Sequence, residues 1–448
     1  MDIFSLIPSF GNIVFTLGAF VLALSIIVTV HEYGHYIVGR WSGIHAEVFS
    51  VGFGPVLLSR EDQYGTKWQI AALPFGGYVR FLGDSNAASG KKGGAIDEMD
   101  AETRRHSMHG APLWARTATV AAGPLFNFAL SIIVFGALAL VRGVAVEPPT
   151  VGAMEQLPPV PMERAELRAG DTILALNGTP TPDYTSFYDA VDAMPADAQA
   201  VYKVRRDGVE AEALGPYPFP PIVSSIQPQS AAMQVGLEEG DVVLAIDGVA
   251  IRSFRQLQDY VMASDGAALE LSVWRDGETL SLTLTPRRMD VPKTEGGFET
   301  RWLIGMTGGL AFAPETRMPG PIEALNYGVE QLTFIARSSL SGLYHMVTGA
   351  ISSCNLSGPL GIAESSGAAA SQGVDSFIWF IAMLSTAVGL LNLFPIPVLD
   401  GGHLVFFAYE AVTGRPPSDK ALRLLMAAGF ALLMGLMVFA LTNDIVCP

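Results

Sequence analysis

The pentapeptide HEYGH, at His31 to His35, places two imidazoles and a carboxylate at the end of a stretch without charged residues, Ile3 to Val30. Residues four apart lie on the same helix face, so His31 and His35 can hold one metal ion, and Glu32 lies beside them to activate a bound water. An HExxH pattern also arises by chance in some chains of this length, so the motif alone is weak evidence for a metal site. The position of the motif at the end of an apolar stretch is stronger evidence, because ionisable groups at membrane depth are costly and mark functional sites.

A catalytic zinc ion usually has three protein ligands and a fourth position open for water. HEYGH supplies two ligands, and the segment NLFPIPVLDGGH, Asn392 to His403, offers the third. Pro395 and Pro397 predict a break in the helix, and broken backbone at membrane depth is tolerated only where protein buries it or water reaches it. Asp400 follows the break and can complete the site if the two spans pack together. His403, three residues on, is a competing candidate.

The composition predicts a membrane protein with a sizeable soluble part. Of the 448 residues, 50% are hydrophobic and 16% are charged, whereas soluble domains carry about 25% charged residues. The net charge of −16 argues against nucleic acid as a partner. Only two cysteines occur, Cys354 and Cys447, which excludes a disulfide framework and a cysteine-based zinc site. We expect both to be inert thiols.

Four stretches are long enough to span a bilayer, which takes about 20 apolar residues. They run from Ile3 through the HEYGH motif, between Arg116 and Arg142, between Asp375 and Asp400, and between Arg423 and Asp444. Lys and Arg residues concentrate in the loop between spans one and two and in the loop between spans three and four, so we expect both loops in the cytoplasm. Both termini and the large segment between spans two and three then face the other side, with HEYGH near the cytoplasmic face.

Residues 151 to 290 contain an internal repeat. The sequence ELRAGDTILALNG, ending at Gly178, matches GLEEGDVVLAIDG, ending at Gly248. Each unit predicts short strands with Asn-Gly or Asp-Gly turns and one helix, at Ser186 to Ala193 and at Phe254 to Met262. The units resemble PDZ domains, which bind extended peptides by adding a strand to a sheet edge. The alternative is a pair of packing modules without a peptide ligand.

Two strand-like runs in the first cytoplasmic loop, Glu47 to Arg60 and Thr66 to Leu82, are joined by the turn sequence EDQYG. They predict a β-hairpin lying against the membrane and the site, with an edge that can pair with an unwound substrate. The alternative is a solvated surface hairpin. Further along, Pro319 to Ala350 is moderately amphipathic and predicts helices at the membrane surface.

Four features taken in order, HEYGH, GPLFNF, the repeated pair and NLFPIPVLDGGH, resemble the site-2 protease family over essentially the whole chain. The resemblance implies an intramembrane zinc metalloprotease with one Zn2+ per chain. His31, His35 and Asp400 take the ligand positions, and Glu32 takes the position of the general base.

The resemblance also gives Asn392 the position of a substrate-binding residue that holds the unwound substrate. Close relatives carry a second asparagine five positions earlier, where this chain has Ala387. The implied partners are the lipid bilayer and the transmembrane segments of pre-trimmed proteins, such as an anti-sigma factor, together with signal-peptide remnants. The implied location is the bacterial inner membrane, with the PDZ-like pair in the periplasm.

The predicted fold class is an α-helical polytopic membrane protein with four transmembrane helices, a membrane-associated β-hairpin region and two inserted PDZ-like α+β domains. We expect eight parts: the first transmembrane helix at 1–40, a cytoplasmic loop at 41–112, the second transmembrane helix at 113–142, PDZ-like domains at 143–215 and 216–290, a linker with membrane-surface helices at 291–374, the third transmembrane segment at 375–411, and the fourth transmembrane helix with the C-terminus at 412–448.

Two other functions stay open on the residues alone. A membrane metalloprotease that acts on soluble or prenylated substrates also uses HExxH, typically with a glutamate ligand on a later helix. A PDZ-bearing membrane adaptor with a structural zinc site is the non-enzyme alternative. The presence of Glu32 argues against the adaptor, because a structural site does not require that carboxylate.

Overall fold

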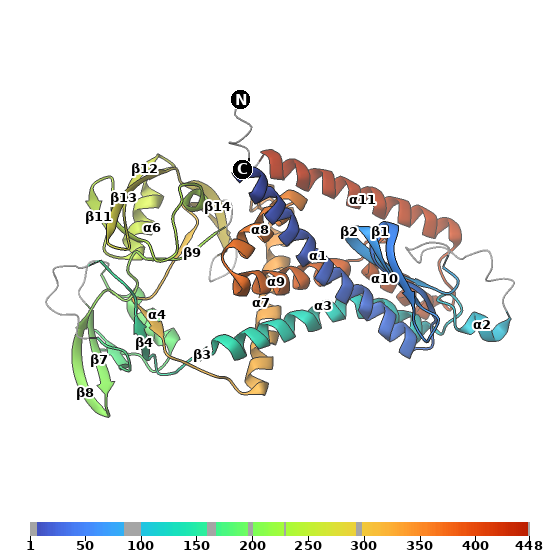
Figure 1. The fold of residues 1–448 in the computed structure, drawn as a ribbon, viewed down its shortest axis with the longest axis horizontal. Coiled ribbons are helices and arrows are strands. Elements are labelled where there is room, and N and C mark those ends of the chain that lie inside the picture. The colour runs from blue at the N-terminus through green and yellow to red at the C-terminus, as the bar shows by residue number, and fades with distance from the viewer. Residues whose placement is uncertain are drawn as a thin grey trace. The chain divides into compact units, whose positions relative to one another are not determined.

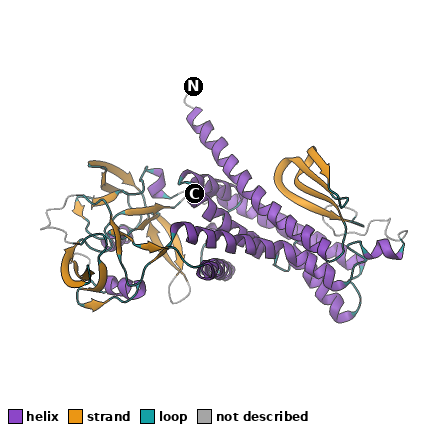
Figure 2. Cartoon of the chain, turned by 60° about the horizontal axis from the view of Figure 1, so that its bottom comes forward, coloured by secondary structure: helices purple, strands orange, loops and turns teal. Residues whose placement is uncertain are grey.

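The computed structural model describes residues 7–84, 100–158, 167–195, 200–227, 230–292 and 298–446. The chain divides into two compact units. The first contains Met1–Leu138, Ile322–Leu343 and Leu356–Pro448, and the second contains Ala139–Pro321 and Tyr344–Asn355. Helices form most of the first unit and strands form most of the second (Figure 2).

Four helices are long and apolar enough to cross a membrane, as the sequence predicts (Figure 1). They are α1 (Ile7–Trp41), α3 (Leu113–Arg142), α9 (Val374–Asn392) and α11 (Asp419–Val446). Lipid offers no hydrogen-bond partner to a backbone, so uninterrupted apolar runs of this length fold as helices that satisfy their own amides.

The third span ends in the predicted break. Helix α9 stops at Asn392, and α10 (Asp400–Thr413) begins after an irregular stretch that contains both prolines. The glycine after Asp400 lets the chain turn tightly, since a Cβ on Gly401 would collide with the carbonyl oxygen of Leu393. The turn therefore holds Asp400 at the first residue of a new helix.

Three further helices complete the α-helical part: α2 (Ala101–Arg105), α7 (Pro321–Val347) and α8 (Pro359–Ser371). Helix α7 lies in the range where the amphipathic pattern predicts helices. Asp444, near the end of α11, caps α8, because its carboxylate accepts hydrogen bonds from the backbone amides of Gly358, Leu360 and Gly361 at 2.7, 3.0 and 3.2 Å. The fourth span is thereby tied to α8.

The predicted hairpin is formed by β1 (Ala46–Glu61) and β2 (Lys67–Phe81). Its register is irregular. Residues 48–51 of β1 pair with residues 77–80 of β2 on one side and with residues 67–70 on the other. The last segment of β2, residues 77–81, pairs with β1 along one side, and its other side is an edge of the sheet. We call this edge segment the rim of the hairpin.

Asp62, in the turn of the hairpin, fastens the sheet to α1. Its carboxylate accepts hydrogen bonds from the Tyr36 hydroxyl at 3.1 Å and from the Trp68 indole at 3.0 Å. It also accepts from the backbone amides of Tyr64 and Thr66. Burial alone would raise the pKa of this carboxyl, but the hydrogen bonds outweigh it and lower the pKa. The hairpin is thus held on the helix that carries HEYGH.

The second unit contains two repeats with the same topology. The first is built from β5 (Thr172–Leu176), β6 (Thr179–Pro180), α4 (Tyr184–Asp192), β7 (Ala200–Arg206) and β8 (Val209–Gly215). The second is built from β10 (Val242–Ile246), β11 (Val249–Ala250), α6 (Phe254–Ala263), β12 (Leu269–Arg275) and β13 (Glu278–Leu284). Their strand orders, β6-β5-β7-β8 and β11-β10-β12-β13, correspond. Both helices lie where the repeat predicts them.

Each repeat buries an equivalent ion pair. Asp171 meets Arg206 with its side chain fully buried, and Asp241 meets Arg275 with only 1% of its side chain exposed. Both aspartates belong to the repeated Gly-Asp sequence, and both arginines belong to the repeated Arg-Asp-Gly sequence. A buried carboxylate needs such a partner, so the repeated motifs are explained by packing within each unit.

Strands from the range expected as a linker form separate two-stranded sheets with strands that precede or follow the four-stranded sheets of the repeats. They include β15 (Phe298–Leu303), which pairs with β14 (Arg287–Pro292); β16 (Met306–Gly308), which pairs with β9 (Val223–Ile226); β17 (Phe312–Pro314), which pairs with β4 (Val151–Met154); and β18 (Thr316–Arg317), which pairs with β3 (Val144–Ala145). Helix α5 (Ala231–Gln234) lies between β9 and β10. The repeats therefore extend further along the chain than the composition suggests, because strands of two or three residues give no periodic signal.

The expectation of inert thiols is wrong for Cys354, which is disulfide-bonded. Cys447 lies outside the described residues. Two cysteines far apart in the sequence carry no information about their separation in space, and a disulfide requires their Cα atoms to lie within about 7 Å.

Candidate metal centre

Helix α1 brings the two histidines of HEYGH together. The Nε2 atoms of His31 and His35 are 3.2 Å apart, and the rings meet edge to face. Between them, Gly34 packs against α3, where a Cβ would lie 2.5 Å from the carbonyl oxygen of Ala122. The absence of a side chain at this position lets α3 approach the imidazoles.

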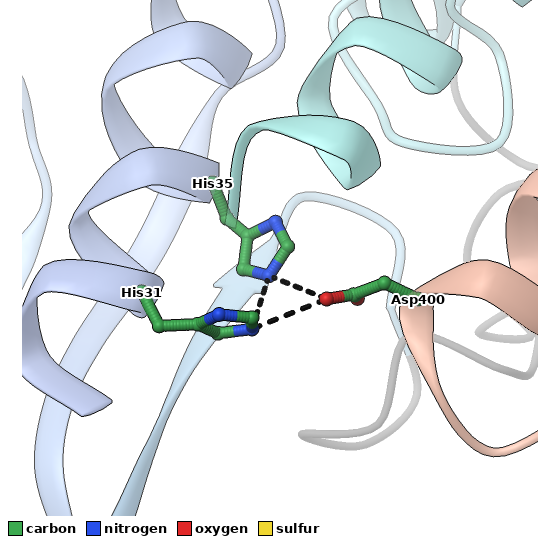
Figure 3. A group of neighbouring side chains, drawn as sticks. All are labelled: His31, His35 and Asp400. Carbon is green, nitrogen blue, oxygen red and sulfur yellow. Dashed lines mark hydrogen bonds and ion pairs between the residues drawn. The ribbon is translucent and has the colours of Figure 1, made fainter. Parts of the chain in front are cut away.

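Asp400 completes the group from the start of α10 (Figure 3). Its Oδ2 atom lies 3.1 Å from His31 Nε2 and 3.5 Å from His35 Nε2. Among the residues that the structure describes, these three are the group of His, Cys, Asp or Glu side chains placed to share a metal ion. The competing candidate His403 is not part of it, and its Nδ1 lies 3.2 Å from the carbonyl oxygen of Leu399.

The donor set and its spacing fit zinc. Bonds of about 2.0–2.1 Å in a tetrahedral site place neighbouring ligand atoms about 3.3 Å apart. The three separations here are 3.1, 3.2 and 3.5 Å. Two imidazole nitrogens and one carboxylate oxygen form a ligand set of the kind that catalytic zinc sites use, with one position left open.

Glu32 lies beside this group and faces the rim of the hairpin. Its carboxylate accepts a hydrogen bond from the backbone of Val79. A Cβ on Gly77 would lie 3.2 Å from Glu32 Cγ, so the rim passes directly against this side chain. The segment with residues 77–81 is thus adjacent to the residue that the sequence predicts to be the base.

Helix α3 supplies the partners of both imidazoles, which the sequence did not predict. His35 Nδ1 lies 2.9 Å from the carbonyl oxygen of Thr119, and His31 Nδ1 lies 3.2 Å from Asn127 Nδ2. Gly123 lies between them in the sequence, and a Cβ there would collide with His35 Nε2. The available signal is that Thr119, Gly123 and Asn127 are spaced by four and share one helix face.

Asn392 occupies the last turn of α9. Its Nδ2 donates to the carbonyl oxygen of Val388 at 3.0 Å, within its own helix, and the side chain is half-buried. The structure does not bring Asn392 into the group of three candidate ligands. Ala387 also lies on α9 and leaves that position without a polar side chain.

The membrane-spanning helices and the His-His-Asp group together define an intramembrane metallopeptidase, and comparison with known proteins identifies the family. The model of peptidase family M50 matches residues 19–436. The chain belongs to peptidase family M50, whose members of the site-2 protease type are zinc metalloproteases.

Curated relatives match over nearly their full length. A protein of Agrobacterium fabrum that carries the name zinc metalloprotease is 34% identical, covering 95% of this chain and 94% of its own. A protein of the same description from Rhizobium meliloti is 34% identical, with 97% of both chains covered. The regulator of sigma-E protease RseP of Salmonella typhimurium is 33% identical, covering 97% of this chain and 99% of its own.

The family and these relatives show that the chain is a zinc metalloendopeptidase of the site-2 protease type. Together with four candidate spans, they indicate a multi-pass protein of the inner membrane. The expectations of an enzyme and of zinc are therefore confirmed. A solved PDZ domain of a Listeria monocytogenes protein matches 19% of this chain and 84% of its own at 22% identity, with a TM-score of 0.16 that is too low to show a shared fold.

Proposed function

We propose that His31, His35 and Asp400 hold the single zinc ion and that Glu32 is the general base. The observation that carries the proposal is the convergence of three ligand atoms from α1 and α10 at tetrahedral spacing, with Glu32 in the same helical turn as His31. A bound zinc ion lowers the pKa of its water to about 7 and polarises the scissile carbonyl.

Proton transfer and orientation of the base are then carried out by residues of the chain. Glu32 takes the proton of the attacking water and passes it to the leaving amine. The hydrogen bond from the backbone of Val79 fixes the orientation of this carboxylate. A peptide bond inside a membrane helix is already hydrogen-bonded, so the substrate must unwind before it can be attacked.

The unwound substrate needs replacement hydrogen bonds, and the rim of the hairpin can offer them. Residues 77–81 have one side paired to β1 and run past Glu32. An extended substrate that adds to this edge would lie beside the base. Asn392 contributes a further contact through its Oδ1, while its Nδ2 stays bonded to Val388.

The substrates in this proposal are the transmembrane segments of pre-trimmed proteins, including an anti-sigma factor, and signal-peptide remnants. The basic loops face the cytoplasm, so the metal centre lies near the cytoplasmic face and the repeats lie in the periplasm. The eight-part division of the chain stands as proposed, with the second repeat unit extended to residue 308 by β16, while β17 and β18 return to β4 and β3 before the first repeat.

The two repeats act in this proposal as PDZ-like filters that hold off substrates with bulky folded domains. A cavity of about 800 Å³ lies between them, lined by α4 residues such as Tyr188 and Asp192 and by α6 residues such as Phe254 and Gln258. Arg255 of α6 donates to the carbonyl oxygen of Asp192, which bridges the two repeats. One shared cavity favours a joint role for the pair over two independent packing modules.

The ligand assignment is tested with purified full-length protein and a model transmembrane substrate. Asp400→Ala should lose cleavage and most of the bound zinc. His403→Ala, three residues on in the same helix, is the matched control and should keep both. Full activity of Asp400→Ala, or loss of zinc from His403→Ala in place of Asp400→Ala, would overturn the assignment.

A further inference from the structure

Asn127 of α3 reaches the candidate metal centre with its side chain. It is fully buried, and its Nδ2 lies 3.2 Å from His31 Nδ1. Its Oδ1 is buried without a hydrogen-bond partner among the described residues. Leaving a buried amide oxygen unpaired costs about 1–3 kcal/mol, so the unused oxygen calls for an explanation.

Two hydroxyl groups fix the place of Asn127 between α3 and α9. Its backbone carbonyl accepts hydrogen bonds from Ser131 Oγ and from Ser385 Oγ, both at 3.0 Å. Ser131 Oγ also lies 2.8 Å from the carbonyl oxygen of Ala382. All three polar side chains, Asn127, Ser131 and Ser385, are fully buried. The backbone at Asn127 is thus held, and the remaining freedom of its amide is rotation about the side chain.

A metal-bound His31 requires an acceptor at Nδ1, and the amide of Asn127 is the group that faces this atom, with Nδ2 at 3.2 Å. When Nε2 is a metal ligand, Nδ1 carries the proton and becomes a donor. Two donors cannot bond, and a half-turn of the Asn127 amide presents the unused Oδ1 instead.

We propose that Asn127 is a positioning residue that orients His31 by accepting a hydrogen bond from Nδ1–H when zinc is bound. An amide is suited to this role because it carries a donor and an acceptor on one rotatable group. His35 does not need an amide partner, because the backbone carbonyl of Thr119 accepts a hydrogen bond from its Nδ1. This inference rests on the proposed ligand role of His31.

The test measures zinc affinity of the purified full-length protein by competition with a chelator, independently of cleavage. Asn127→Leu removes both polar groups at similar volume and should weaken zinc binding by about 10–100-fold, the usual cost of losing such a partner. Asn127→Asp keeps only the acceptor and should bind zinc at least as tightly as the wild type. Thr386→Val removes a fully buried hydroxyl of α9 that bonds within its own helix, to the carbonyl oxygen of Ala382, and should leave zinc affinity unchanged.

The unfolding temperature of the metal-free variants separates positioning from packing. We expect Asn127→Leu and Thr386→Val to unfold at similar temperatures and yet to differ in zinc affinity. If leucine prevents folding, Asn127→Ser, which is too short to reach His31, replaces it. Zinc affinity of the wild-type level in a folded leucine or serine variant would overturn the inference, and so would equal losses in the leucine and aspartate variants. Wild-type zinc content in His31→Ala would instead refute the proposed ligand set.

Discussion

The ion pair between Arg116 of α3 and Glu410 of α10 predicts that the position of Asp400 depends on a contact about 15 Å away, ten residues along the helix. Arg116 Nη2 lies 2.6 Å from Glu410 Oε1, and Nη1 lies 3.1 Å from Oε2. The side chains are 14% and 18% exposed. The Arg116 guanidinium also lies over the ring of Phe407, at 5.3 Å from its centroid. The pair thus fastens α10, which begins with Asp400, to α3.

The magnitude follows from burial and geometry. Both side chains are less than one-fifth exposed, so solvent screens the pair only weakly. Arg116→Met keeps the apolar length of the side chain and leaves the Glu410 carboxylate buried without its partner, which costs about 3–5 kcal/mol. Replacing both residues in Arg116→Met/Glu410→Leu removes the uncompensated charge, and the double variant should regain most of that stability.

The assay is denaturant unfolding of the detergent-solubilised full-length protein, with zinc content measured in parallel. We expect Arg116→Met to lower the free energy of unfolding by about 3–5 kcal/mol. It should also retain less zinc, because α10 is no longer held against α3. Arg415→Met, at an exposed arginine, is the matched control and should change stability by no more than about 0.5 kcal/mol. A single variant as stable as the wild type, or a double variant no more stable than the single, would refute the reasoning.

Three other predictions concern the base, the orientation and the repeats. Glu32→Gln should keep zinc and the fold but lower the cleavage rate by at least about a hundredfold, as for a lost general base, and near-normal turnover would contradict that role. A cysteine at Glu102 should be shielded from an impermeant thiol reagent in intact cells while one at Glu239 reacts, with the native chain labelled in parallel; the reverse pattern would invert the topology. Deleting residues 146–315, whose flanking strands β3 and β18 pair with each other, should preserve zinc and allow cleavage of untrimmed substrates. If a folded, zinc-loaded deletion variant no longer cleaves a trimmed substrate, the repeats deliver substrates instead of filtering them.

Features encoded by local sequence were predicted well. Long apolar runs gave the four spans, and alternating strand-like runs around EDQYG gave the hairpin of β1 and β2. The repeat placed a helix at Ser186 to Ala193, and α4 runs from Tyr184 to Asp192. Two prolines before Asp400 indicated the break that begins α10. In each case neighbouring residues carry the period or the breaker that determines the element.

Features that depend on distant partners were not predictable in this way. Strand β17 has three residues, and it exists because β4, far earlier in the chain, offers it an edge. The disulfide bond of Cys354 likewise reflects proximity in space and leaves no local pattern. The choice between Asp400 and His403 was open on spacing alone, and only the turn at Gly401 places one of them against the histidines.

The contribution of α3 to the metal centre could not be predicted from the sequence. It provides the carbonyl of Thr119, which any residue would offer, the missing side chain of Gly123, and the neutral amide of Asn127. None of these has a chemical signature of its own, whereas the ligands are ionisable residues in a known spacing. The spacing of four becomes meaningful only once α3 is known to face HEYGH. The identity of the proposed ligands is therefore encoded locally in the sequence, while their orientation is set by α3, which carries neither ligand motif.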